Sequence, residues 1–173
     1  MGWFAVPLSS NNMVHFLTST STTPRLATCS VIPFKASSPF LNMPTAALPS
    51  KPDAPVAYEL LEGDVASTLL VVFLNGLGLP QTVWKPAIDL FLQQSTLSPK
   101  PWLLTYDRYG QGASARDPRE SSPGKEPGYA HTLDDVTDDL RELIQTVSPD
   151  RSSRIVFVNN SIGAHVARRY ADR

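Results

Sequence analysis

The stretch that decides the fold is residues 155–171, which read I-V-F-V-N-N-S-I-G-A-H-V-A-R-R-Y-A. The apolar run at its start predicts a buried strand, and a helix is predicted directly after Ser161. Because no loop separates the two elements, the serine lies at a sharp turn that strains its backbone. Gly163 provides the small residue that such a turn requires on the helix side. The pattern therefore places the Ser161 hydroxyl at the carboxyl end of a sheet, where open α/β proteins bind ligands.

Upstream of this stretch, apolar runs of strand length alternate with helical patterns. Strands are expected at 56–61, 68–74, 102–106 and 155–158, and helices at 80–94, at 132–148 and after Ser161. Asp135 follows Thr132 at the spacing of a capping box, which marks the start of the second helix. Short apolar strands alternating with helices predict an α/β fold with a mainly parallel sheet flanked by helices.

Three segments resemble motifs of the α/β-hydrolase fold family, in its serine hydrolase, AB hydrolase-1-like branch, and they follow one another along the chain in the order that this family requires. N-N-S-I-G at 159–163 resembles the nucleophile elbow G-x-S-x-G, with Asn159 in place of the first glycine. N-G-L-G-L-P at 75–80 resembles the H-G-x-x-x-P oxyanion loop, with Asn75 in the histidine position. Y-D-R-Y-G-Q-G-A-S at 106–114 is similar to the D-x-x-G-x-G-x-S segment of the prolyl peptidase and epoxide hydrolase-like branch.

The resemblance implies a serine hydrolase that transfers an acyl group to water from a small or medium substrate, which is an ester, a thioester or a similar acyl compound. Ser161 would attack the carbonyl carbon, and the backbone N–H groups of Leu77 and Ile162 would stabilise the oxyanion. Loop and elbow geometry would depend on Asn75, Gly76 and Gly163. A serine nucleophile argues against epoxide hydrolase chemistry, for which the family uses a carboxylate. No cofactor and no metal are expected.

The triad partners of such a serine, a carboxylate and a histidine, follow it on later loops in this family. Here only His165 and Asp172 are available, on the helix of the elbow itself. His165 lies one turn down that helix, so it is not positioned to take the proton of Ser161. The resemblance therefore covers the N-terminal half of the fold, and we expect a truncated, inactive domain over 53–173 with an open sheet edge. The alternative is a non-catalytic fragment or interaction module that retains half of the hydrolase fold.

Residues 1–52 have a different chemistry from the remainder of the chain. They contain no Asp or Glu and are rich in Ser, Thr and Pro, so we expect a disordered extension.

The net charge of −1 gives no reason to expect nucleic acid as a partner. No apolar run approaches the ~18 residues of a membrane span. The single cysteine, Cys29, favours a reducing compartment and hence the cytoplasm, with a mitochondrial transit segment as the alternative. Oligomeric state stays open.

Overall fold

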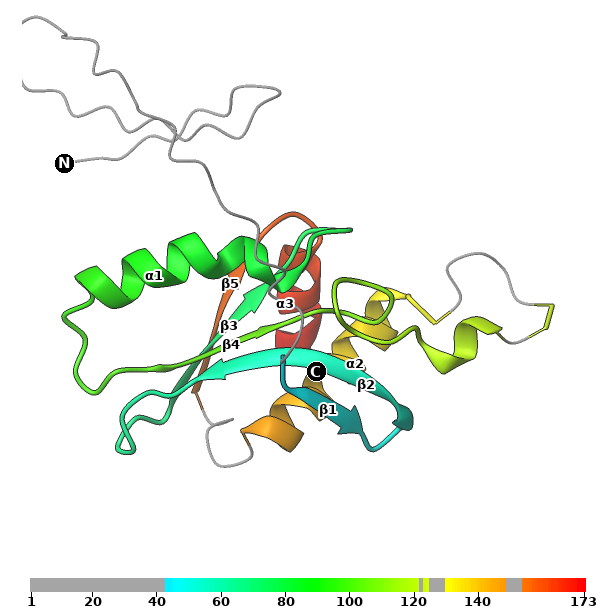
Figure 1. The fold of residues 1–173 in the computed structure, drawn as a ribbon, viewed down its shortest axis with the longest axis horizontal. Coiled ribbons are helices and arrows are strands. Elements are labelled where there is room, and N and C mark those ends of the chain that lie inside the picture. Colours follow the sequence, from blue (N-terminus) through cyan, green and yellow to red (C-terminus); the bar gives the residue numbers. More distant parts are fainter. Residues whose placement is uncertain (1–42, 122, 125–129, 149–153) are drawn as a thin grey trace, which may run out of the picture. The chain divides into compact units, whose positions relative to one another are not determined.

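The computed structural model describes residues 43–121, 123–124, 130–148 and 154–173. These residues form one sheet with the strand order β1-β2-β4-β3-β5 and helices on both of its faces (Figure 1). The strands are β1 (Thr45–Leu48), β2 (Lys51–Leu61), β3 (Leu69–Leu74), β4 (Trp102–Tyr106) and β5 (Arg154–Asn159). The helices are α1 (Lys85–Gln94), α2 (Leu133–Val147) and α3 (Gly163–Ala171), with short 3₁₀ helices η2 (Gln81–Trp84) and η3 (Pro118–Ser121).

The sheet is mixed, and its parallel half leads to the elbow. Strand β3 runs parallel to β4 on one side and to β5 on the other, whereas β2 is antiparallel to both β1 and β4. A two-residue connection between β1 and β2 forces the antiparallel arrangement of this hairpin. The predicted α/β class with flanking helices is confirmed, and parallel pairing is confined to β4, β3 and β5.

Strand β1 lies inside the segment expected to be disordered, so for residues 45–52 that prediction is wrong. Ala46 and Leu48 of β1 are buried, and β2 begins at Lys51, whose side chain is also buried. A four-residue strand is too short to show a period of two, and only its partner strand makes it stable. Residues 1–42 lie outside the described part of the chain.

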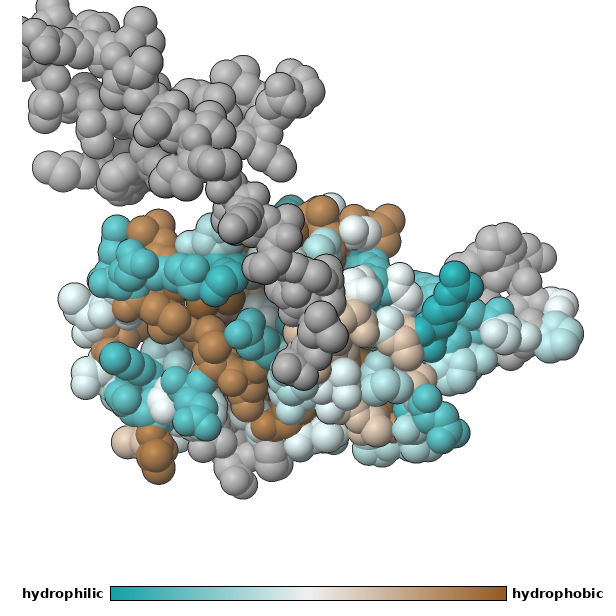
Figure 2. All heavy atoms as spheres, viewed as in Figure 1, coloured by the Kyte–Doolittle hydropathy of each residue, from teal (hydrophilic) through white to brown (hydrophobic). Residues whose placement is uncertain are grey.

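Alternating side chains of β3 build the core on the two sides of the sheet. Leu70, Val72 and Leu74 pack toward α2 and α3, while Val71 and Phe73 pack toward α1. The helices contribute Leu140, Leu143 and Ile144 from α2, Val166 from α3 and Ile88 from α1. A strand covered on both faces is apolar throughout, as predicted for residues 68–74. The face beside α1 is less completely covered, and hydrophobic atoms stay visible there (Figure 2).

Helix α2 begins with the predicted capping box. The backbone N–H of Asp135 donates to Thr132 Oγ1 at 3.2 Å, and the backbone N–H of Thr132 donates to Asp135 Oδ2 at 3.0 Å. Two N–H groups that the first helical turn leaves unpaired are thereby satisfied.

A buried ionic network ties the loop after β4 to β2 and α2. Lys51 Nζ lies 2.6 Å from Asp117 Oδ2 and 2.5 Å from Asp139 Oδ1. Arg119 contacts Asp117 at 2.9 Å and Asp135 at 2.6 Å. Burial by itself raises the pKa of Asp117, but hydrogen bonds from Arg119 and Lys51 outweigh it and hold the pKa well below 3.8. The network therefore anchors residues 107–121, which form one wall of the candidate site.

We expect Asp117→Asn to lower the free energy of unfolding by about 3 kcal/mol, because removing one partner of a buried ion pair leaves charges uncompensated. Its side chain is fully buried, and the substitution preserves its shape. Urea denaturation measures the loss. The exposed pair Lys85–Asp89 is the control, since Asp89→Asn should change stability by less than about 0.5 kcal/mol.

The same variant has a defined pH signature. A carboxylate whose pKa is lower in the folded than in the unfolded chain stabilises the fold above its unfolded pKa. That contribution disappears as the pH falls from 3.8 toward the folded pKa. The stability difference between wild type and Asp117→Asn should therefore shrink below pH 3.8. A difference that stays constant down to pH 2 would contradict this assignment.

Candidate active site

The turn between β5 and α3 places Ser161 in a left-handed conformation. Strand β5 ends at Asn159, α3 begins at Gly163, and Ser161 between them has φ of +54° and an exposed side chain. The N–H of Gly163 donates to Asn160 O at 3.0 Å, and that of Ala164 donates to Ser161 O at 3.0 Å. The strained backbone predicted for this serine is confirmed.

Close approach of α3 to β3 explains why the elbow needs a small residue on its helix side. A Cβ atom on Gly163 would lie 2.6 Å from the carbonyl oxygen of Leu74 and 2.9 Å from its Cβ. Both of these atoms belong to a buried strand that cannot move aside. Asn159, two residues before the serine, is exposed, so its larger side chain is accommodated without burial.

The loop after β3 forms a tight turn that hydrogen bonds from the Asn75 side chain stabilise. The N–H of Leu79 donates to Gly76 O at 3.4 Å, and Gly78 has φ of +73°, as the third residue of a type II turn requires. The buried Asn75 amide donates to Leu79 O at 3.2 Å and to Tyr106 O at 3.1 Å. Its carbonyl oxygen accepts from Trp84 Nε1 at 2.7 Å. Asn75 thus connects this turn to β4 and η2.

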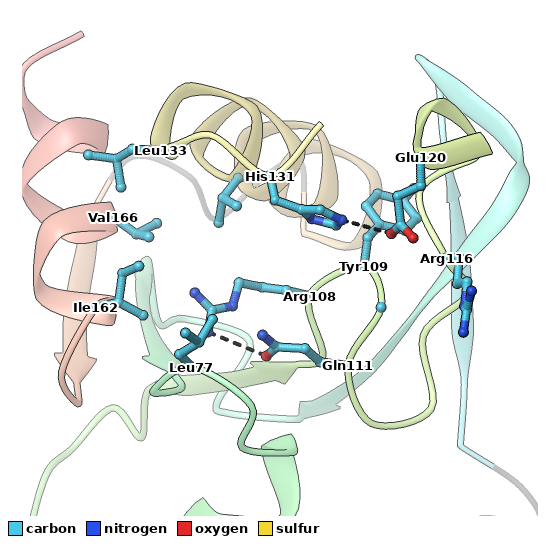
Figure 3. Close-up of a pocket in the computed structure, with 12 residues that line it drawn as sticks. Leu77, Arg108, Tyr109, Gln111, Arg116, Glu120, His131, Leu133, Ile162 and Val166 are labelled. Carbon is cyan, nitrogen blue, oxygen red and sulfur yellow. Dashed lines mark hydrogen bonds and ion pairs between the residues drawn. The ribbon is translucent and has the colours of Figure 1, made fainter. Parts of the chain in front are cut away.

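The structure brings this loop against the elbow. A Cβ atom on Gly76 would lie 3.6 Å from Ser161 Cβ and 3.8 Å from Asn160 Cγ. Leu77 and Ile162, the two residues expected to supply oxyanion donors, line one cavity of about 550 Å³. Figure 3 shows their side chains at the same end of this cavity. Ser161 lies next to Ile162 in the chain but is not itself among the residues that line the cavity.

Arg108 orients the peptide that joins Gly76 to Leu77. Its Nη2 donates to Gly76 O at 2.8 Å, and the N–H of Leu79 donates to the same oxygen. In a trans peptide the carbonyl and the following N–H point in opposite directions. With Gly76 O turned toward Arg108, the Leu77 N–H is directed away from it.

Asp107 holds the loop that carries Arg108. Its Oδ1 accepts from the N–H of Gln81 at 2.6 Å, and its Oδ2 accepts from the N–H of Ala113 at 2.9 Å. Gly112 has φ of +52°, and a Cβ there would overlap the Asp107 carboxylate. Ser114 Oγ closes the loop by donating to Asp107 O at 2.6 Å. The aspartate and glycines of this segment therefore act as structural supports of the site.

The other end of the cavity contains a hydrogen-bonded pair that the sequence did not indicate. His131 Nε2 lies 2.7 Å from Glu120 Oε1, and both residues line the cavity (Figure 3). They belong to a Gly- and Pro-rich loop region with no local pattern, so only the folded chain brings them here. His165 is exposed on α3, and within the described residues Ser161 Oγ makes no hydrogen bond to a histidine.

The described residues contain no group of three side chains suited to hold a metal ion. No helix among them has the length and apolar character needed to cross a bilayer.

A model of the alpha/beta hydrolase family matches residues 71–173. The solved structures that resemble this chain include a hydrolase from Pseudomonas aeruginosa, which is 24% identical with a TM-score of 0.55 over 75% of this chain and 40% of that one. The enol-lactonase from Burkholderia xenovorans is 24% identical, with a TM-score of 0.53 over 75% of this chain and 43% of that one. Epoxide hydrolase A from Mycobacterium thermoresistibile is 17% identical, with a TM-score of 0.54 over 75% and 34% of the two chains.

At these identities the solved structures establish similarity of fold alone. The chain spans less than half the length of each of the three. No curated protein matches it.

Proposed function

Because this chain belongs to the alpha/beta hydrolase family, we propose that it carries the nucleophile and the oxyanion loop of a serine hydrolase. Ser161 attacks the carbonyl carbon of an ester-like acyl substrate, and the N–H groups of Leu77 and Ile162 stabilise the developing oxyanion. A serine at this position favours acyl transfer over epoxide opening. The cytoplasmic location inferred from Cys29 stays a prediction.

The observation that carries this proposal is the φ of +54° at Ser161. A left-handed backbone costs a residue with a side chain about 1–2 kcal/mol, and such strain persists where function requires it. An ordinary helix-capping serine has extended backbone angles instead. The strained turn exposes the hydroxyl ahead of α3, where the N-terminal N–H groups of the helix favour negative charge.

The turn at residues 76–79 supports the same proposal. Gly76 lies against Ser161, because a Cβ atom there would be in van der Waals contact with Ser161 Cβ at 3.6 Å. Leu77 occupies the second position of this turn, where the backbone N–H takes no part in the turn's own hydrogen bond. Its N–H is therefore free to donate to a substrate oxygen.

We infer that the Ser161 hydroxyl has low intrinsic reactivity in residues 1–173 alone. Activation of a serine requires a general base within hydrogen-bond reach, and no histidine occupies that position in the part of the chain that the structure describes. Turnover by this chain is therefore expected to be slow, and covalent labelling of Ser161 relies on the residual acceleration of about 10³–10⁴ that oxyanion donors and binding supply without a complete triad.

A second candidate function is a non-catalytic module that binds a partner strand along β5. Strand β5 pairs with β3 on one side, and no described strand pairs with its other side. Val156 on this strand is 47% exposed. An unpaired edge of this kind is a template for a further strand. A folded chain that resists labelling at Ser161 would favour this candidate.

The test of the hydrolase proposal is reaction of the folded chain with a fluorophosphonate probe, followed by peptide mass spectrometry. We expect the adduct on Ser161, in the peptide spanning the elbow, and no adduct after the chain has been unfolded in urea. Labelling that is spread over several serines, or that survives unfolding, would show that the elbow does not activate its hydroxyl.

A further inference from the structure

The cavity of about 550 Å³ beside the elbow has an apolar wall and a basic side chain inside it. Its volume is that of a typical small-molecule site. The apolar wall consists of Leu77, Leu133, Val136, Ile162 and Val166. The charged residues that line it are Arg108, Arg116 and the pair formed by Glu120 and His131. Glu120 already has a partner, which leaves the two arginines as the cavity's unpaired charges within the described residues.

Arg108 is a buried cation with neutral partners only. It is 9% exposed, its Nη2 donates to Gly76 O and to Gln111 Oε1, and its Nε is buried without a hydrogen-bond partner. Among the described residues no carboxylate pairs with it, in contrast to the buried Lys51, which contacts two. A guanidinium does not lose its proton in a protein, so this charge stays in the cavity.

A buried charge without a counter-ion is unfavourable, because the water that solvated it has been removed. Burial lowers the pKa of Arg108 from its ordinary value, which has the same physical cause. An anion bound beside the guanidinium would reverse both effects. The buried guanidinium of Arg108, which has no counter-ion, is therefore suited to bind an anionic ligand.

The direction of the side chain shows where that anion would lie. Figure 3 shows the Arg108 guanidinium extending toward the end of the cavity formed by Leu77 and Ile162. Gly76 lies between the two sites, since its oxygen is 2.8 Å from Arg108 Nη2 and its Cα faces Ser161. The anion and the reacting carbonyl of one ligand would thus be separated by a short spacer.

We propose that Arg108 binds the carboxylate of an acyl substrate, so that the site selects short esters which also carry a carboxylate. The apolar wall accommodates the spacer, and the guanidinium forms charge-assisted hydrogen bonds with the carboxylate. That the bound molecule is an ester rests on the proposed function. Anion binding by Arg108 rests on the cavity alone.

Equilibrium binding of a matched pair of ligands tests this proposal. Monoethyl succinate carries one carboxylate and diethyl succinate carries none, and calorimetry or ligand-observed NMR measures both dissociation constants on the intact chain. We expect the half-ester to bind at least about 10-fold more tightly than the diester, which is the lower range for a hydrogen bond to a charged group. Equal affinities, or no detectable binding of the half-ester, would overturn the proposal.

Arg108→Gln separates anion binding from the support of Gly76. Glutamine retains an amide that can donate to Gly76 O but removes the charge. We expect it to weaken half-ester binding about 10- to 100-fold and to weaken diester binding far less. An equal loss for both ligands would show that Arg108 only positions the loop, and the proposal would fail. Arg116→Gln is the matched control, because it removes an exposed charge from the same cavity and should change binding less than about threefold.

A second variant and a separate labelling experiment distinguish loss of the anion site from misfolding and from loss of the Ser161 site. If Arg108→Gln does not fold, Arg108→Lys retains the charge and should still prefer the half-ester, whereas loss of that preference in a folded protein would contradict the proposal. Fluorophosphonate labelling of the same preparations reports on Ser161 separately. Arg108-dependent binding of the half-ester without labelling would refute the serine hydrolase and leave the anion site standing.

Discussion

Replacing Ser161 with alanine or glycine is expected to abolish fluorophosphonate labelling of the chain, because both substitutions remove the oxygen that forms the phosphonate ester. The loss should be complete within the sensitivity of mass spectrometry. Ala130→Gly is the control, since Ala130 is the other described non-glycine residue with positive φ, at +74°. This variant alters a left-handed position away from the elbow and should be labelled at the wild-type rate.

The two Ser161 variants should differ in stability, which tests the strain independently of the chemistry. Glycine adopts a left-handed backbone freely, whereas alanine bears the same steric penalty as serine. We therefore expect Ser161→Gly to raise the free energy of unfolding by about 1 kcal/mol and Ser161→Ala to leave it nearly unchanged. Urea denaturation of the three proteins measures both values. A glycine variant less stable than wild type would contradict a strained elbow.

Leu77→Pro is expected to slow labelling of Ser161 by about 10²–10³-fold, the usual effect of losing one oxyanion donor. Proline removes the backbone N–H and leaves the remainder of the site intact. It is also the residue favoured at the second position of a type II turn, and Gly78 with φ of +73° follows it. The turn should therefore form normally while the donor is absent.

Leu77→Ala is the matched control for this experiment. Alanine shortens a side chain that is 74% exposed and keeps the N–H, so labelling should slow by less than about twofold if the donor is what counts. Second-order labelling rates, measured at several probe concentrations, give the comparison. If proline and alanine reduce the rate equally, the side chain of Leu77 and not its amide contributes to the site.

The structure connects these variants through one loop. Arg108 holds Gly76 O and thereby directs the Leu77 N–H, while Asp107 in turn fixes the loop on which Arg108 lies. The ionic network around Asp117 anchors the same segment to β2 and α2. We therefore expect that substitution of Asp117 both destabilises the loop after β4 and changes the orientation of the Leu77 N–H, the proposed oxyanion donor.

The features that the sequence predicted correctly are those decided by neighbours in the chain. The apolar runs of β3 and β4 are long enough to show strands buried on both faces. Strand β5 was predicted as a strand correctly, but the prediction that it is buried is wrong, since its residues are half-buried or exposed. Thr132 and Asp135 are three residues apart, so their capping box could be recognised directly. A serine between a strand and a helix with no loop between them requires a strained turn whatever lies around it. Local sterics and periodicity were sufficient in each case.

The features that were not predicted from the sequence, or were predicted wrongly, all depend on contacts between residues that are distant in the chain. Strand β1 is stable only because β2 pairs with it and its alternate residues become buried, so four residues by themselves gave no signal. The antiparallel direction of β2 next to β4 follows from pairing across the sheet. The position of His131 beside Glu120 depends on how a loop without periodicity packs.

The sequence by itself therefore determined the α/β class and the sharp turn at Ser161, because periodicity and short-range geometry dictate them, whereas the loop at residues 75–80 was identified by its resemblance to a family motif. Only the tertiary structure decided that Gly76 lies against Ser161 and that the Arg108 charge is buried in the cavity lined by Leu77 and Ile162. The physical reason is that burial and the loss of solvent are properties of the assembled core. An arginine after a strand is ordinary in a sequence, and it becomes a candidate anion site once the fold has removed its water and supplied no counter-ion.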